Sequence, residues 1–185
     1  YQLDDKLEEL FLEKSQTSSS AFNRLFDETM AGLRFEVDGE MLSLEPTLNL
    51  MQSPDEAKRR KGSEALARTF GANIKLFTLI TNTLAKDKEI EDRWRGFPTA
   101  QTARHLSNHV EPEVVEALRN AVVAAYPRLS HRYYRLKAKW LGLDKLQVWD
   151  RNAPLPMETD RIVAWDGHDP RVECGQHGGN RAGIV

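Results

Sequence analysis

The sequence has little of the material that marks cross-linked, secreted or membrane-spanning proteins. Cys174 is its single cysteine, and one thiol cannot form an internal disulfide, so a reducing cytoplasm is expected. No apolar run approaches the roughly 20 residues that cross a bilayer, and no secretory signal pattern is visible. The formal net charge is only −2, whereas nucleic acids and anionic membranes bind clustered basic surfaces. We therefore expect a cytoplasmic protein with neither of these partners.

Familiar catalytic motifs are also missing. There is no glycine-rich phosphate loop, no nucleophile elbow and no Ser-His-Asp set. His105 and His109 have the spacing of a zincin histidine pair, but that motif requires Glu directly after the first His, where Leu106 stands. A helix break is expected at 110–112, and a third ligand would still be needed. We interpret the two histidines as a surface coincidence, with a zinc site as the alternative.

Three other clusters could carry chemistry. Cys174 and His177 form a Cys-x-x-His pair near His168, but a structural zinc site needs four ligands, so an incidental tail is preferred over a metal site. The Lys and Arg run at 58–61 points around a helix and predicts a solvated face, with a phosphate-binding patch as the alternative. Five aromatic residues are interpreted mainly as core, with a ligand groove as the alternative. They are Tyr126, Tyr133, Tyr134, Trp140 and Trp149.

Helical periodicity is what the sequence does contain. Leu3, Leu7 and Leu10 recur at helical spacing between acidic residues, which predicts an amphipathic helix. Further helices are predicted at 18–30, 53–84, 87–94, 99–106, 111–126 and 128–141, with a short helix or turn at 46–52. Gly62 and Gly71 allow a bend within 53–84. An extended segment is predicted at 143–156.

One hairpin interrupts this pattern. Asp38-Gly39 lies between the alternating segments 33–37 and 40–42, and Asp-Gly favours a tight two-residue turn. The clearest helix start is Ser53-Pro54-Asp55, where Ser53 would be the N-cap and Pro54 the first helical residue. The expected fold class is therefore all-α, mainly bundle-like, with one small β-hairpin near 33–43.

Three stretches, taken in order, carry a resemblance. The first is Ser53-Pro54-Asp55 with Ala57, Arg59 and Arg60, and the second is the loop Arg95-Gly96-Phe97-Pro98-Thr99-Ala100. The third is the most specific. It comprises His131-Arg132-Tyr133-Tyr134-Arg135-Leu136-Lys137, Leu141-Gly142-Leu143-Asp144-Lys145-Leu146, Trp149-Asp150 and Ala153-Pro154-Leu155. In this order and with these gaps, the sequence resembles the oligoendopeptidase F family of thimet-oligopeptidase-like zinc metallopeptidases.

The resemblance implies a nearly all-helical fold with a deep channel that admits short peptides. In the family, two His of a His-Glu-x-x-His helix and a Glu on a later helix hold zinc, which serves the hydrolysis of internal peptide bonds. No residue of this chain matches that motif. The resemblance therefore assigns this chain no catalytic, cofactor-binding or metal residues, and zinc is expected only in the intact parent enzyme.

The resemblance runs from about Tyr1 to Trp165. It predicts a helical N-terminal or channel-wall segment at 1–165 and an atypical tail at 166–185, either disordered or altered by a frameshift near Gly167. The chain opens at Tyr1 within a helical pattern, so we expect a piece of a longer protein. Helix faces that would pack on the missing catalytic domain are expected to cause self-association.

Three interpretations of the function remain open. The first is a non-catalytic fragment of a zinc-dependent oligoendopeptidase that forms part of the substrate channel wall. The second is a stand-alone or degenerate helical module that binds peptides without cleaving them. The third is a purely structural helical adaptor.

Overall fold

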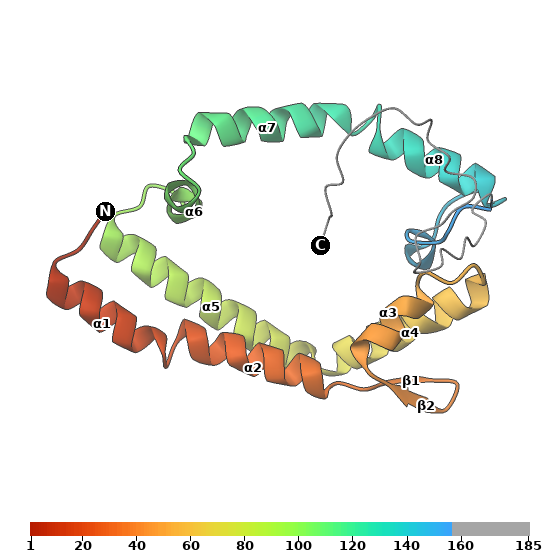
Figure 1. Cartoon of the computed structure of the whole chain (residues 1–185), viewed down its shortest axis with the longest axis horizontal. Helices are drawn as coiled ribbons and strands as arrows, with labels where there is room; N and C mark the ends of the chain where they lie inside the picture. The colour runs from red at the N-terminus through yellow and green to blue at the C-terminus, as the bar shows by residue number, and fades with distance from the viewer. Residues whose placement is uncertain (157–185) are drawn as a thin grey trace, which may run out of the picture.

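The computed structural model describes residues 1–156 and consists of helices with one small hairpin (Figure 1). The helices are α1 Asp5–Ser15, α2 Ser19–Gly32, α3 Leu44–Leu50, α4 Glu56–Ala72, α5 Ile74–Arg95, α6 Thr102–Ser107, α7 Pro112–Ala125 and α8 Ser130–Trp140. Strands β1 Phe35–Val37 and β2 Glu40–Leu42 follow α2, and the 3₁₀ turn η1 Val148–Asp150 follows α8. The predicted fold class, helical with a hairpin near 33–43, is confirmed.

Helices α1, α2 and α5 form one arm of the molecule, in which α1 and α2 lie along α5 (Figure 1). Aromatic pairs join them. The rings of Phe26 in α2 and Phe77 in α5 have centroids 5.9 Å apart, and those of Phe11 in α1 and Trp94 in α5 are 6.5 Å apart. Edge-to-face pairs of this kind add about 0.5–1.5 kcal/mol each beyond the burial of apolar area. The periodic apolar residues of the sequence therefore meet across this arm.

The hairpin packs its inner face against α4. Asp38 and Gly39 both have positive φ, 54° and 86°, as a type I′ turn requires. Phe35 faces Leu42 across the antiparallel pair. It is fully buried, and its ring centroid lies 5.5 Å from that of Phe70 in α4. A hairpin this short is marginal alone, so the helix is what stabilises it.

Helix α3 lies close to α4 because α4 has a glycine at the crossing. A Cβ on Gly62 would lie 3.0 Å from Leu50 Cβ and 3.2 Å from the Thr47 carbonyl oxygen. Thr47 is itself fully buried, and its hydroxyl donates to the Ser43 carbonyl at 2.8 Å. Glycine is unfavourable inside a helix, but because Gly62 has no Cβ it permits the close approach of α3.

Two predicted helix boundaries are wrong. The N-cap of α4 is Asp55, whose carboxylate accepts from the Ala57 backbone N–H at 2.9 Å, so Ser53 and Pro54 precede the helix. The Ser53 hydroxyl accepts from the Asp55 N–H at 3.2 Å instead. The helix predicted over 53–84 breaks at Asn73, close to Gly71 where a bend was allowed, but α5 then runs unbroken through the predicted boundary near 87.

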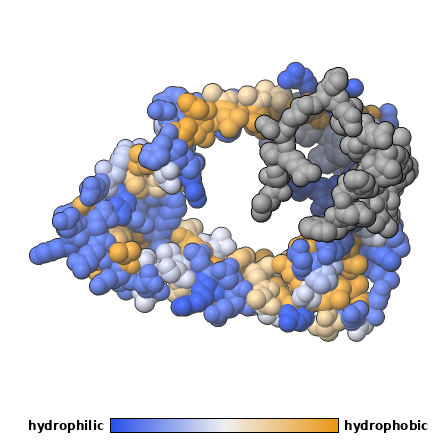
Figure 2. Space-filling model, in the orientation of Figure 1, coloured by the Kyte–Doolittle hydropathy of each residue, from blue (hydrophilic) through white to orange (hydrophobic). Residues whose placement is uncertain are grey.

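The segment after α5, which contains α6, α7, α8 and η1, leads away from the first arm and back to α4. Helix α7 spans from the α6 end of the first arm to α8, and α8 with η1 returns to α4, so the helices enclose an open space (Figure 1). Figure 2 shows the surface hollowed there, with hydrophobic residues on the α7 side.

The buried apolar core of the described part of the chain is correspondingly small. It comprises Phe35, Ala65, Ile80, Ala138 and Ala153. Within residues 1–156, no helix is long and apolar enough to cross a membrane.

Candidate functional site

The segment after α8 is fixed to α4 by a buried ion pair. Arg59 of α4 donates to Asp150 at 2.9 Å, and the two side chains are only 4% and 1% exposed. The second carboxylate oxygen of Asp150 accepts from the Gln147 N–H at 2.8 Å, which closes the 3₁₀ turn. Arg59 also donates to the carbonyls of Ser53 and Pro54, each at 2.9 Å. One arginine therefore joins the start of α4 to the turn that follows α8.

Further contacts position the same segment from both sides. Trp149 donates its indole N–H to Glu56 of α4 at 3.0 Å, and the Arg60 guanidinium lies 5.7 Å from the Trp149 ring centroid. From α8, Lys137 donates to the Arg151 carbonyl at 2.8 Å, and Lys137 is only 3% exposed. The backbone at 147–151 is thus held between α4 and α8.

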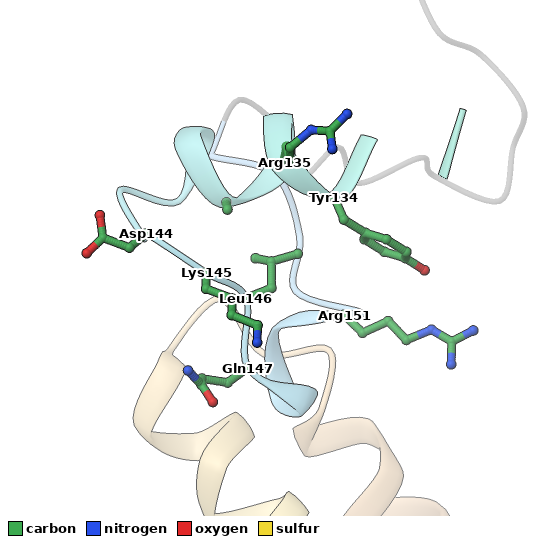
Figure 3. A pocket seen from close by; sticks show the side chains of 8 residues that line it. Tyr134, Arg135, Asp144, Lys145, Leu146, Gln147 and Arg151 are labelled. Carbon is green, nitrogen blue, oxygen red and sulfur yellow. The ribbon is translucent and has the colours of Figure 1, made fainter. Parts of the chain in front are cut away.

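A cavity of about 420 Å³ lies between α8 and this held segment (Figure 3). We call it the α8 cavity. It is lined by Tyr134, Arg135, Ala138, Asp144, Lys145, Leu146, Gln147 and Arg151. Three of these residues are cationic and one is anionic, while Ala138 and Leu146 supply an apolar surface. The arrangement suits a ligand with a negative group and an apolar part.

A second cavity, of about 340 Å³, lies between α1 and α5 and is lined by residues that include Phe11 and Trp94. Beside it, Arg95 binds Glu8 through two hydrogen bonds of 2.8 and 2.9 Å. These bonds, with one from the Leu3 N–H, lower the pKa of the Glu8 carboxyl from 4.5 to about 2. Hydrogen bonds to Glu8 and Glu91 raise the pKa of Arg95. This region is an ionic clamp between two helices.

The structure separates the two histidines that share zincin spacing. Helix α6 ends at Ser107, and His109 follows it with a φ of 50° in the left-handed region. The Val110 N–H returns to the His105 carbonyl at 3.1 Å, as in a Schellman cap. His109 thus lies beyond the last helical residue, and the chain turns away from the helix at His109 itself.

The basic run at 58–61 divides among different roles. Arg59 is buried in the ion pair with Asp150, whereas Arg60 binds Glu64 at 2.8 Å and Lys61 binds Asp38 at 2.9 Å. The expectation of a wholly solvated face is therefore wrong for Arg59, because its guanidinium has buried oxygens to bind. Arg60 and Lys61 are bound to separate acidic partners, which disfavours a phosphate patch shared by the run. Arg59 and Asp150 belong to motifs on which the family resemblance rests. That resemblance was the signal in the sequence that could have marked the two residues as important.

Four of the five aromatic residues at 126–149 do not form a core. Tyr126, Tyr133, Tyr134 and Trp140 are between 39% and 49% exposed. The prediction of core packing is wrong for these four residues, since the open arrangement of α7 and α8 offers few elements to cover them. Tyr134 instead lines the α8 cavity.

Metal ligation finds no support within the part of the chain that the structure describes. No three or more His, Cys, Asp or Glu side chains are grouped there in a way that could hold a metal ion. Cys174, His177 and His168, interpreted as part of an incidental tail with a metal site as the alternative, lie outside the described residues, as does the frameshift hypothesis near Gly167.

The chain is similar to known oligopeptidases in sequence. A family model described as Oligopeptidase F matches residues 1–35. Group B oligopeptidase PepB of Streptococcus agalactiae is 30% identical over 119 residues, which cover 64% of this chain and 20% of PepB. Oligopeptidase PepF of Bacillus subtilis is 26% identical over 171 residues, which cover 89% of this chain and 25% of PepF.

The fold agrees with the sequence matches. The crystal structure of oligoendopeptidase-F from Enterococcus faecium matches with a TM-score of 0.61 at 26% identity, over 67% of this chain and 26% of that one. These matches support assignment to the oligoendopeptidase F family. The chain spans only part of the length of these relatives, 20% of PepB and 25% of PepF.

Proposed function

We propose that this chain is a non-catalytic helical segment of a zinc-dependent oligoendopeptidase that hydrolyses internal peptide bonds in short oligopeptides. The proposal is supported chiefly by the long match to PepF, which covers 89% of this chain. In this proposal residues 1–165 are the channel-wall segment and 166–185 a separate tail, and the parent acts in the cytoplasm. Its partners are short peptides and the catalytic domain of the same protein.

The open arrangement of helices gives the segment a physical role in such an enzyme. Helix α7 stands opposite the α2 and α5 arm, and the space between them is open in the space-filling view (Figure 2). A wall of this kind limits the width of a substrate, so an extended peptide can enter where a folded protein cannot. The segment then contributes shape and orientation to the reaction.

Zinc is proposed for the parent alone. Residues 1–156 do not fit such a site, because they contain no grouping of the ligand types that zinc needs. His105 lies in α6, whereas His109 follows the end of that helix with a left-handed φ of 50°, so one helix does not carry both histidines. The residues that hold the ion belong, in this proposal, to other parts of the enzyme.

Two measurements test the proposal. The gene, read in frame beyond the codon of Val185, is expected to encode His-Glu-x-x-His. A stop codon soon after the Val185 codon would count against an enzyme segment. The chain alone, supplied with zinc, is expected to leave an internally quenched fluorogenic peptide intact. Turnover of that peptide by the chain alone would contradict the non-catalytic role.

A second function has one observation in its favour. The α8 cavity, with its cationic and apolar lining, would serve a helical module that binds peptides without cleaving them. A gene without the downstream motif, together with measurable peptide binding, would favour this alternative.

A further inference from the structure

We propose that the α8 cavity binds the C-terminal carboxylate end of an oligopeptide. This inference rests on the proposed function for its choice of peptide as the ligand class. It does not depend on catalysis, and it assigns a specific binding role to Arg135, Lys145 and Arg151.

The charges around the cavity favour an anion. Arg135, Lys145 and Arg151 line it together with a single carboxylate, Asp144. Figure 3 shows Asp144 pointing to the opposite side from Tyr134 and Arg151. An arginine presents paired N–H donors that match the two oxygens of a carboxylate.

Within residues 1–156 the arginines fall into two groups, those that bind a carboxylate and those, including Arg135 and Arg151, that are in no ion pair. Arg59, Arg60, Arg68 and Arg95 are each bound to a carboxylate. In residues 1–156, no ion pair of 4.0 Å or less involves Arg135, Lys145 or Arg151. Lys145 and Arg151 thus keep donors for a ligand, whereas Arg135, whose guanidinium points away from them in Figure 3, must turn to reach it.

The apolar part of the cavity favours a peptide end over a bare anion. Ala138 is 4% exposed and lies with Leu146 in the wall, and the Tyr134 ring is a further contact surface. A volume of about 420 Å³ falls within the range of small-ligand sites, about 300–1,000 Å³. It can take the last side chain of a peptide beside its carboxylate. The amide of Gln147 adds a polar group of the kind that fixes a peptide backbone.

The backbone beneath these side chains is already fixed. The Arg151 carbonyl accepts from Lys137 at 2.8 Å, and the turn at 147–150 is tied to α4 through Asp150 and Arg59. A site whose backbone is held before binding loses less entropy when the ligand arrives. Only the exposed ends of the cationic side chains must become ordered.

The test compares one short peptide ending in Leu, as its free acid and as its C-terminal amide, by isothermal titration calorimetry on the full chain. The acid is expected to bind about tenfold more tightly or better, since hydrogen bonds between charged groups are worth more than neutral ones. The double variant Arg135→Gln/Arg151→Gln is expected to lose this preference. Arg132→Gln, on the same helix but outside the cavity lining, is expected to keep it.

The controls separate folding and anion effects from recognition of a peptide end. Arg135→Lys/Arg151→Lys preserves charge and is expected to retain part of the preference, while circular dichroism checks that each variant is folded. Equal affinity for acid and amide would overturn the inference, as would inorganic phosphate binding as tightly as the peptide acid. A gene lacking the catalytic motif would refute the parent enzyme, yet would leave the acid-over-amide preference intact.

Discussion

Single residues in this chain show how charge is used where the core is small. Glu8 and Arg95 are far apart in sequence, yet the guanidinium meets both carboxylate oxygens at 2.8 and 2.9 Å. The Arg95 guanidinium also lies 5.8 Å from the Phe11 ring centroid. Charge and apolar contact therefore act together where α1 lies against the end of α5.

The Glu8 carboxyl gives a prediction about acid sensitivity. Its pKa is about 2 in the folded chain against an ordinary 4.5, because Arg95 and the Leu3 N–H donate to its charged form. Ionised Glu8 thus stabilises the folded state above about pH 4.5, and this contribution is lost as the pH falls from 4.5 toward 2. The carboxyl carbon of Glu8, followed by nuclear magnetic resonance, is expected to titrate near 2.

The matched variants for this titration are Arg95→Gln and Arg93→Gln. Arg95→Gln is expected to return the Glu8 midpoint toward its ordinary value, since the charged donor is gone. Arg93→Gln removes a charge from the same helix and is expected to leave the Glu8 midpoint unchanged, because Arg93 pairs with Glu89, at 3.9 Å. A normal Glu8 midpoint in the unmodified chain would mean that the clamp does not form in solution.

At the scale of elements, the buried pair Arg59 and Asp150 joins α4 to the turn after α8. Asp150→Ala leaves the buried guanidinium without its counter-charge, so it is expected to lower the free energy of unfolding by about 3–5 kcal/mol. Arg59→Met/Asp150→Leu removes both charges and is expected to cost clearly less. Urea denaturation followed by circular dichroism measures both changes.

The exposed pair Arg60 and Glu64 on the same helix provides the control. Its side chains are 59% and 49% exposed, and exposed pairs four residues apart on a helix contribute about 0.3–0.5 kcal/mol. Glu64→Ala is therefore expected to change stability only slightly. If Asp150→Ala were equally mild, the ion pair would not be the anchor of the turn.

The elements also show which features the sequence could reveal. The hairpin was predictable because Asp38-Gly39 has local turn chemistry, and the helix break expected at 110–112 falls where α7 begins at Pro112. The cap of α4 was misassigned because Ser53 and Asp55 both accept hydrogen bonds, and the choice depends on the backbone. The Arg59 partner was not predictable from local pattern, since Asp150 is 91 residues away.

The α8 cavity illustrates a harder limit. Its lining comes from α8 and the segment after it, and neither periodicity nor a motif indicates a hollow between them. The sequence placed Tyr134 in an aromatic set expected to be core, because hydrophobic pattern cannot distinguish a buried face from an uncovered one. Which faces remain uncovered depends on how α7 and α8 cross the open space (Figure 1).

At the scale of the whole molecule, uncovered apolar surface is the dominant feature. Val114, Leu118, Val122 and Val123 of α7 are between 44% and 66% exposed. Three of them recur four residues apart and share one helix face. A helix of 14 residues gains little stability from propensity alone. Contact between this face and other protein would therefore stabilise α7, and in the proposed parent that protein is the catalytic domain.

In the chain by itself, the same face is expected to cause self-association, because contiguous exposed apolar surface is unusual on monomers. Leu118→Lys places a charge on this face and should shift the chain toward monomer in sedimentation velocity measured over a range of concentrations. Asn120→Lys adds the same charge at another position on the helix and should have little effect. An unmodified chain that stays monomeric at the highest concentration would contradict the expected self-association.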